Sequence, residues 1–291
     1  MPSKANLSGT TLPRRQLGKA LRDARQARGM TLDQVAHDTE NSRSTLSRVE
    51  LGQYDKIKVR EIEYLCRYYS LPDAQSQYLM SLASQANTKV WWQDYRHLLD
   101  PGFSTYLELE SYANQFSFYQ PLIIPGLLQT ADYARAVQCL FAPEDSPVEV
   151  DQRVELRMQR SARLTRQHWP VRAEFLLHET IFHTIVGSGL TMAAQCRHIA
   201  DMSTRENILV RFVPFSAGLP TGSAIPPFIV LEFPENEPSV VYTEAAIGSM
   251  TFEDEEDVKR FQALYGTLRH AAMEQQPSRD RIRKIARRYE Q

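Results

Sequence analysis

The sequence predicts a multidomain chain, with an all-α N-terminal domain followed by an α+β C-terminal domain. Apolar residues recur at helical spacing through the first ninety positions, whereas strand-like apolar runs appear only after residue 170. The chain has 291 residues, which is enough for two domains of ordinary size. Hydrophobic residues make up 42% and charged residues 24%, as is typical of globular proteins.

Two amphipathic helices open the first domain. The first is predicted to run for about thirteen residues and to end at Gly29, which suits the left-handed position just past a helix end. Thr31 is expected to cap the short second helix. The predicted inner faces are Leu17, Ala20, Leu21 and Ala24 in the first helix, and Leu32, Val35 and Ala36 in the second.

Three more helices complete the predicted bundle. Ser42 is expected to cap the third helix, and Gly52 ends it. The fourth helix stops before Pro72, and the fifth follows. Two short helices joined by a tight turn, inside a small bundle, form a helix-turn-helix unit. The apolar positions are Val59, Ile62, Leu65, Cys66 and Tyr69 in the fourth helix, and Tyr78, Leu79, Leu82, Ala83 and Ala86 in the fifth.

The third helix carries its polar and apolar residues on opposite sides. At about 100° per residue, the polar set of Arg43, Ser44, Ser47 and Arg48 spans roughly 140° of the helix surface. Leu46 and Val49 lie on the other side, and we expect them to anchor the helix to its bundle. A polar stripe is often only a solvated helix face, but the five-helix layout favours a surface that reads double-stranded DNA.

Each polar residue of this surface has an expected role. Arg43, Ser44 and Arg48 are expected to face base edges, because arginine can contact guanine O6 and N7 together. The amides that follow the Ser42 cap favour a phosphate. Residues 1–60 hold twelve basic and six acidic side chains, so this end of a chain with net charge −1 is basic and suits a polyanion. Phosphate contacts are expected from Ser47, Lys56, Lys58 and Arg60.

Residues 17–69 resemble the phage-repressor-type (Xre family) helix-turn-helix domain. The resemblance rests on LRDARQARGMTLDQVA, STLSRVELGQ and the final helix VREIEYLCRYYSL. It implies a structural ion pair between Arg25 and Glu50, since the family pairs an arginine before the first turn with a glutamate that closes the recognition helix. Two segments depart from the family pattern: Glu40-Asn41 replaces glycine and an aliphatic residue, and Tyr54-Asp55-Lys56-Ile57 replaces the usual proline.

The rest of the chain alternates predicted helices with later strands. Helices are predicted from Leu107 to Phe118, after the Pro125-Gly126 turn up to residue 141, from Val148 to Gln167, and from Thr191 to Thr204. Two more are expected from about Asp254 and at the chain end. The strand-like runs are Val171–Leu177, Ile208–Val213, Pro227–Phe233 and Val240–Tyr242.

An arginine stripe marks the long helix at 148–167. Spacings of three and four residues place these arginines on one side of the helix. The stripe is open to three interpretations: a second nucleic-acid surface, a solvated face, or salt bridges to another helix. The stripe consists of Arg153, Arg157, Arg160, Arg163 and Arg166.

Residues 90–275 resemble a second family, the C-terminal domain of actinobacterial Xre-type regulators of the Scr1 or WhiJ-like group (DUF5753). The resemblance rests on LIIPGLLQTADYARAV, RMQRSARL, FLLHETIF, NILVRFVPFSAG and FIVLEF with VVYTEAAIG, in this order. It implies a regulator often encoded beside a small DUF397-type protein and acting in development, specialised metabolism or an antitoxin-like pairing.

No catalytic, metal or cofactor site is predicted. His178 and His183 are five residues apart, whereas the metalloprotease motif needs four on a helix. Gly187-Ser188-Gly189 lacks the third glycine of a dinucleotide fingerprint and is better interpreted as a turn. A self-cleaving serine–lysine pair is not expected, because the only lysines after Lys89 are Lys259 and Lys284 on late helices. The three cysteines match no metal or redox spacing.

These expectations define a cytoplasmic transcriptional regulator. We divide it into an arm (1–14), a DNA-binding domain (15–88), a regulatory or partner-binding domain (89–275) and a basic C-terminal helix (276–291). A homodimer is expected, because one such unit buries little DNA surface. The aromatic-rich region 91–119 is interpreted as core, with a small-molecule effector pocket or a partner groove as alternatives. The alternative function is an antitoxin or adaptor that binds a DUF397-type partner and uses DNA binding for autoregulation.

Overall fold

The computed structural model divides into two compact units. The first comprises Met1–Asp94 with Leu107–Leu109, and the second comprises Tyr95–Tyr106 with Glu110–Gln291. The structure describes the chain except residues 1–11, 55, 88–90, 167–169, 235–236 and 246–247. Among the described residues, none of the helices combines the length and the apolar character needed to cross a membrane.

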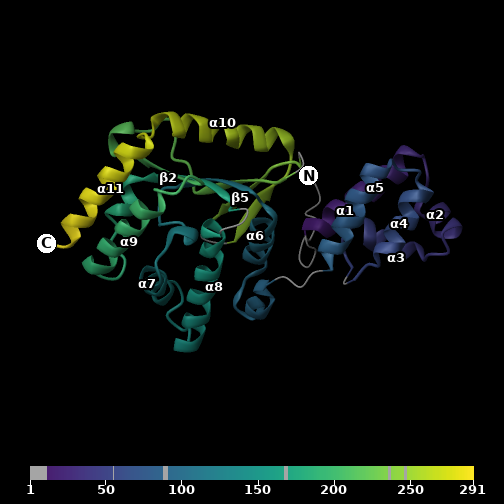
Figure 1. The fold of residues 1–291 in the computed structure, drawn as a ribbon, viewed down its shortest axis with the longest axis horizontal. Helices are drawn as coiled ribbons and strands as arrows, with labels where there is room; N and C mark the ends of the chain where they lie inside the picture. Colours follow the sequence, from purple (N-terminus) through teal and green to yellow (C-terminus); the bar gives the residue numbers. More distant parts are fainter. Residues whose placement is uncertain (1–11, 55, 88–90, 167–169, 235–236, 246–247) are drawn as a thin grey trace. The chain divides into compact units, whose positions relative to one another are not determined.

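Among its described residues the first unit holds five α-helices, as the sequence predicts (Figure 1). They enclose one apolar core that includes Leu17, Val35, Leu46, Ile62 and Leu79. The expected arm at 1–14 lies mostly outside the described residues, and its last three residues form the first turn of the first helix. The helices are α1 (Leu12–Ala27), α2 (Leu32–Asp38), α3 (Arg43–Glu50), α4 (Val59–Tyr68) and α5 (Asp73–Ala86).

Side-chain caps define where α2 and α3 begin. Thr31 and Gln34 form a capping box, in which each side chain accepts a hydrogen bond from the other residue's backbone N–H. The Ser42 hydroxyl accepts a hydrogen bond from the Thr45 N–H at 3.1 Å. Caps of this kind satisfy helix N–H groups that have no partner within the helix. Both helix starts are therefore set by short-range sequence signals.

A six-stranded mixed sheet forms the centre of the second unit. Its order is β3-β2-β1-β4-β5-β6, with β1, β2 and β3 parallel and the remaining pairs antiparallel. β1 pairs with β2 on one side and with β4 on the other, so it lies in the interior of the sheet. The strands are β1 (Gln115–Gln120), β2 (Arg172–His178), β3 (Ile208–Val213), β4 (Phe228–Glu232), β5 (Val240–Glu244) and β6 (Ser249–Phe252).

Helices cover both faces of this sheet (Figure 1). α10 (Glu255–Ala271) packs Val258, Tyr265 and Leu268 on one face, against Leu176, Val230 and other strand residues. The opposite side holds α6 (Pro101–Tyr112), α7 (Ala131–Phe141), α8 (Pro147–Thr165) and α9 (Gly189–Met202). This arrangement gives the second unit the predicted α+β class.

The predicted helix from Leu107 to Phe118 is wrong beyond Tyr112. α6 ends at Tyr112, and the segment Gln115–Gln120 is strand β1. Phe116 and Phe118 are buried while Gln115 and Ser117 are half-buried, which is the two-residue alternation of a strand. Pairing with β2 and β4 decides this segment, and these partners lie far along the chain. The short edge strand β6 is not among the strands that the sequence predicts.

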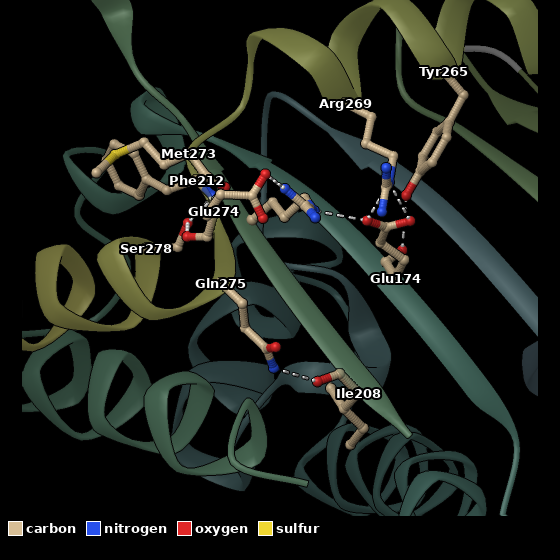
Figure 2. Close-up of polar contacts among 10 residues, drawn as sticks. Glu174, Ile208, Phe212, Tyr265, Arg269, Met273, Glu274, Gln275 and Ser278 are labelled. Carbon is tan, nitrogen blue, oxygen red and sulfur yellow. Dashed lines mark hydrogen bonds and ion pairs between the residues drawn. The ribbon is translucent and has the colours of Figure 1, made fainter. Parts of the chain in front are cut away.

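The last helix, α11 (Gln275–Tyr289), belongs to the second unit and covers the edge of the sheet at β3. Figure 2 shows the junction between α10 and α11 beside this edge. The Met273 N–H donates to the Phe212 carbonyl at 2.8 Å, and the Phe212 N–H donates to the Ser278 hydroxyl at 2.9 Å. The side-chain amide of Gln275 donates to the Ile208 carbonyl. These contacts satisfy backbone groups of an edge strand that would otherwise face solvent.

Ion pairs fix the same junction to the sheet (Figure 2). Arg211 of β3 contacts Glu174 of β2 and Glu274, both at 2.9 Å, and Arg269 of α10 contacts Glu174 at 2.8 Å. Hydrogen bonding to Glu274 raises the pKa of the Arg211 guanidinium. The tail of the chain is therefore attached to the sheet by both backbone and charged contacts.

Candidate nucleic-acid interface

The recognition helix α3 presents its predicted polar residues outward. Arg43, Ser44 and Arg48 are exposed, whereas Leu46 and Val49 lie in the core of the first unit at 4% and 7% exposure. Ser42 is exposed at the N-cap, and Ser47 is half-buried. The helix therefore presents an outward polar surface with two guanidinium groups, spaced five residues apart over its two turns.

Two arginines of α1 bind the C-terminal end of α3. Arg25 donates from Nε and Nη2 to the two carboxylate oxygens of Glu50, at 2.6 and 2.8 Å. The Arg25 Nη1 group also donates to the Met30 carbonyl, and Arg22 donates to the Glu50 carbonyl at 2.7 Å. The hydrogen bond to Glu50 raises the pKa of Arg25 above its ordinary value. These contacts fix the orientation of α3 relative to α1.

Gly18 allows this close approach of α1 to α3. A Cβ atom at Gly18 would lie 2.5 Å from the Val49 carbonyl oxygen and 2.7 Å from that of Glu50. Contacts that short would force the two helices apart. The sequence pattern marked the apolar face of α1, but it did not identify Gly18 as part of the support for the recognition helix.

The turn between α2 and α3 is built around a left-handed residue. Glu40 has a φ of 54°, in the region that glycine adopts most readily. Asn41 closes the turn: its N–H donates to the Ala36 carbonyl at 3.0 Å, and its side-chain amide donates to Thr39. The turn therefore keeps a compact geometry although Glu40-Asn41 replaces the expected glycine and aliphatic residue.

The other predicted phosphate contacts follow α3 along the chain. Lys56 is exposed in the loop, Lys58 is the N-cap residue of α4, and Arg60 is exposed in the first turn of α4. Lys58 is engaged by Glu61, with an Nζ–Oε1 distance of 3.3 Å. Asp55, in the same loop, lies outside the described residues.

Sequence reasoning missed one charged neighbour of α3. Asp33, in the first turn of α2, contacts Arg43 with an Oδ1–Nε distance of 3.3 Å. An acidic residue in a first helical turn is common, because the helix dipole favours it. No spacing rule signals that it would meet an arginine across the turn.

The arginine stripe of α8 points largely into the second unit. Arg160 forms a buried, two-point ion pair with Glu110 of α6, at 3.0 and 2.7 Å. Arg163 donates to the carbonyls of Glu110, Ser111 and Ala113 around the C-terminal end of α6. The interpretation of the stripe as a second nucleic-acid surface is therefore wrong for these arginines, and the alternative of salt bridges to another helix describes Arg160.

The other inward-facing arginines of the stripe hold connecting segments. Arg153 contacts Asp145 at 2.8 Å and donates to the Leu98 carbonyl. Arg157 donates to the Ala134 carbonyl and to Gln138 of α7. Burial lowers the pKa of Arg157 to about 10, and the nearby positive charges of Arg160 and Arg153 act in the same direction. The last member, Arg166, is exposed at the end of α8.

His178 ends β2, and His183 lies near the buried carboxylate of Glu179. Glu179 accepts hydrogen bonds from the Phe215 N–H at 2.8 Å and from Arg281 of α11 at 3.0 Å, and His183 lies 3.5 Å from it. The Nδ1 atom of His178 is instead hydrogen-bonded to the Thr180 hydroxyl. In the part of the chain that the structure describes, no group of three or more histidine, cysteine or acidic side chains has metal-binding geometry. Glu179 connects three segments of the fold.

The glycine-containing segment before α9 forms a turn followed by a helix cap. Gly187 has a φ of 71°, and the Ser188 hydroxyl accepts a hydrogen bond from the Thr191 N–H at 3.2 Å. These features agree with the interpretation of Gly187-Ser188-Gly189 as a turn.

A hollow of about 330 Å³ lies between α9 and α11. Arg197 pairs with Glu290 across it, and Arg283 lies 3.9 Å from Asp201. The hollow therefore combines three arginines with two carboxylates over a floor of small side chains. Its lining residues are Arg197, Ala200, Asp201, Arg283, Ala286, Arg287 and Glu290.

Comparison with known families assigns both parts of the chain. A helix-turn-helix domain model matches residues 16–79. A model described as a domain of unknown function, DUF5753, matches residues 103–284 and so covers more than half of the chain. No curated protein and no solved structure gave a match. The DUF5753 resemblance inferred from the sequence motifs is confirmed.

Proposed function

The chain belongs to the DUF5753 family and carries a helix-turn-helix domain, and from this premise we propose that it is a sequence-specific, DNA-binding transcriptional regulator of the cytoplasm. The observation that carries the proposal is the outward polar surface of α3. Arg43 and Arg48 are exposed there, while Leu46, Val49 and the Arg25–Glu50 pair hold the helix from behind.

We assign the contacts by side-chain chemistry. Arg43, Ser44 and Arg48 contact base edges in the major groove, because the guanidinium group matches the two acceptors of guanine. Ser42, Ser47, Lys56, Lys58 and Arg60 contact the phosphate backbone, which fixes the register of the helix on the duplex. Lys58 exchanges its Glu61 partner for a phosphate in this scheme.

Two copies bind one operator in our proposal. A single helix-turn-helix unit buries too little surface for tight specific binding, so a two-fold site with half-sites about 34 Å apart, or a multiple of that distance, is expected. We assign dimerisation to the second unit, together with the sensing of an effector or a partner protein. We place the effector in the hollow between α9 and α11, where arginines and carboxylates line the wall together.

Footprinting on the DNA that flanks the chain's own gene tests the DNA-binding proposal. The wild-type protein is expected to protect a two-fold symmetric site. Arg43→Ala and Arg48→Ala should each weaken binding to that site by about 1–3 kcal/mol and relax the base preference there. The affinity for random DNA should fall less. Lys56→Ala should weaken binding to all DNA sequences alike. It should also reduce the slope of log affinity against log salt concentration by about one, the value for one phosphate contact.

Arg67→Ala is the matched control, because Arg67 is an exposed arginine of α4 that pairs with Glu63 within its own helix. It should leave the operator affinity unchanged. Absence of a protected site, or equal losses for Arg43→Ala on operator and random DNA, would contradict the proposal. A stoichiometric small protein that co-purifies with the chain and releases it from DNA would favour the adaptor alternative.

A further inference from the structure

We propose that Asp33 is a positioning residue for Arg43, holding its guanidinium group in the orientation that selects guanine. The inference rests on the proposed function, because it concerns how one residue of that DNA-reading surface is prepared for its base. It adds a carboxylate of α2 to a surface that otherwise consists of residues from α3 and the segment after it.

The geometry of the two helix starts brings the pair together. Asp33 lies in the first turn of α2, and Arg43 is the first residue of α3. The Thr31–Gln34 capping box fixes the start of α2, and the Ser42 cap fixes the start of α3. The hydrogen bonds of Asn41 fix the turn between them. The carboxylate and the guanidinium therefore meet across a defined backbone rather than by the motion of two free chain ends.

The atoms in contact leave one edge of the guanidinium group free. Asp33 Oδ1 lies 3.3 Å from Nε of Arg43, so the carboxylate occupies the Nε side. Within the described residues, this ion pair is the one polar contact of Arg43. The two terminal nitrogens make no polar contact among the described residues and are therefore available as a pair of donors. Guanine offers two acceptors, O6 and N7, in the major groove, whereas adenine offers one acceptor and one donor. A fixed pair of donors therefore favours guanine.

Holding the side chain in place has a larger effect on selectivity than on folding. The side chains of Asp33 and Arg43 are 71% and 68% exposed, and an exposed ion pair contributes only about 0–1 kcal/mol to stability. Arginine loses up to about 2 kcal/mol of rotamer entropy when it is immobilised. A contact that restricts the side chain before DNA arrives reduces this loss on binding. Displacement of water at the DNA interface also strengthens the pair.

Arg48 provides a contrast on the same helix. It is exposed, and among the described residues no carboxylate forms an ion pair with it. Within the part of the chain that the structure describes, Arg48 therefore lacks the restraint that Asp33 places on Arg43. We accordingly expect the base read by Arg43 to be the more strictly selected of the two.

The same carboxylate should weaken general attraction to DNA. A negative charge beside the major groove opposes the phosphates, so its removal should strengthen sequence-independent binding. A positioning role therefore predicts opposite effects of one substitution: weaker base selection and equal or tighter binding to random DNA. A purely structural role of Asp33 would weaken both kinds of binding together.

The test measures base preference with a randomised duplex library and affinity with random DNA, using the full-length protein. Asp33→Ala and Asp33→Asn should lower the preference at the Arg43 base about three- to tenfold, which corresponds to roughly 0.6–1.4 kcal/mol. Asp33→Glu should restore part of it. Asp23→Ala, which removes an exposed carboxylate of α1 and gives the same change in net charge, should raise affinity for random DNA without changing base preference.

The Arg43→Ala background identifies the route of the effect. If Asp33 acts through Arg43, then Asp33→Ala changes nothing further at that base once Arg43 is absent. An unchanged preference in Asp33→Ala, or the same loss with and without Arg43, overturns the inference while leaving the proposed function intact. A wild-type protein that selects no sequence at all overturns the proposed function and this inference with it.

Discussion

Glu50, the last residue of α3, is bound by Arg25 of α1 through two hydrogen bonds of 2.6 and 2.8 Å. The Glu50 side chain is only 8% exposed, so the pair lies at the inner side of the recognition helix and away from its reading surface. A partly buried pair of this kind fixes geometry more than it adds net stability. The orientation in which Arg43 and Arg48 face outward depends on it.

The first prediction concerns the loss of Glu50. Glu50→Ala leaves the Arg25 guanidinium without its carboxylate in a mostly buried position, which should lower the free energy of unfolding of the first unit by about 3–5 kcal/mol. Chemical denaturation measures the effect. Glu63→Ala is the control, because it removes a half-buried carboxylate of α4 that pairs with the exposed Arg67, and it should change stability by less than about 1 kcal/mol. Equal stabilities of the two variants would refute the structural role of the pair.

The second prediction concerns Glu40, whose φ of 54° is unfavourable for a residue with a side chain. The left-handed conformation costs such a residue roughly 1–2 kcal/mol. Glycine avoids this cost but loses about 0.5–1 kcal/mol of backbone entropy on folding. Glu40→Gly should therefore raise the free energy of unfolding of the first unit by up to about 1 kcal/mol.

Two further variants separate backbone strain from charge in this test. Glu40→Ala removes the carboxylate but keeps the strain, so it should not stabilise the unit. Ser70→Gly should stabilise it in the same way as Glu40→Gly, because Ser70 also has a positive φ, of 47°. A stabilising Glu40→Ala would show that the charge, and not the conformation, is the unfavourable feature.

The first unit could be predicted largely from sequence because its signals are local. Helix caps such as Ser42, breakers such as Gly29 and Pro72, and apolar residues at helical spacing act over a few residues, and the helices follow them. The burial of Leu46 and Val49 behind a polar stripe followed from the same spacing. These local signals are enough to predict which side of α3 faces outward, because no distant contact decides it.

Local signals are not sufficient to predict the second unit. Spacings of three and four residues placed the α8 arginines on one side of a helix but could not tell whether that side faces solvent. The partner of Arg160 is Glu110, fifty residues earlier, and no local rule connects them. β1 was assigned to a helix for the same reason, since pairing with β2 and β4 decides it. The Asp33–Arg43 contact also needs the three-dimensional turn.

The third prediction concerns the acid stability of the second unit. Burial alone would raise the pKa of Glu110, but the charge and hydrogen bonds of Arg160 outweigh it, so the pKa lies below the ordinary value of 4.5. Because the folded-state pKa is lowered, this carboxylate stabilises the fold above pH 4.5, and the contribution is lost as the pH falls from there through the folded-state pKa. Denaturation of the second unit at pH 7, 4 and 3 should show this loss.

Glu110→Gln tests whether that pH dependence belongs to this pair. The amide cannot ionise, so the variant should be less stable at pH 7 and should lose less stability on acidification than the wild type. Glu155→Gln serves as the control, since Glu155 is an exposed carboxylate of α8, and it should keep the wild-type dependence. A Glu110→Gln protein with an unchanged pH profile would assign the acid sensitivity to other groups.

The fourth prediction uses the three free cysteines as reporters. Cys139 is exposed on α7, whereas Cys66 in the first unit and Cys196 in the second are buried. Burial raises the pKa of both buried thiols, that of Cys196 to about 12, so neither forms the reactive thiolate readily at neutral pH. A thiol reagent should therefore modify Cys139 rapidly and the other two only when their unit opens.

Peptide mapping by mass spectrometry would assign each modification to its cysteine. In the Glu50→Ala protein, labelling of Cys66 should accelerate strongly, because the Arg25–Glu50 pair that this variant removes lies in the same unit. Labelling of Cys196 should stay at the wild-type rate. In the Arg160→Ala protein, which loses the buried partner of Glu110, the opposite pattern is expected. Acceleration of both cysteines by either variant would mean that the two units unfold as one, contrary to the independent cores on which these predictions depend.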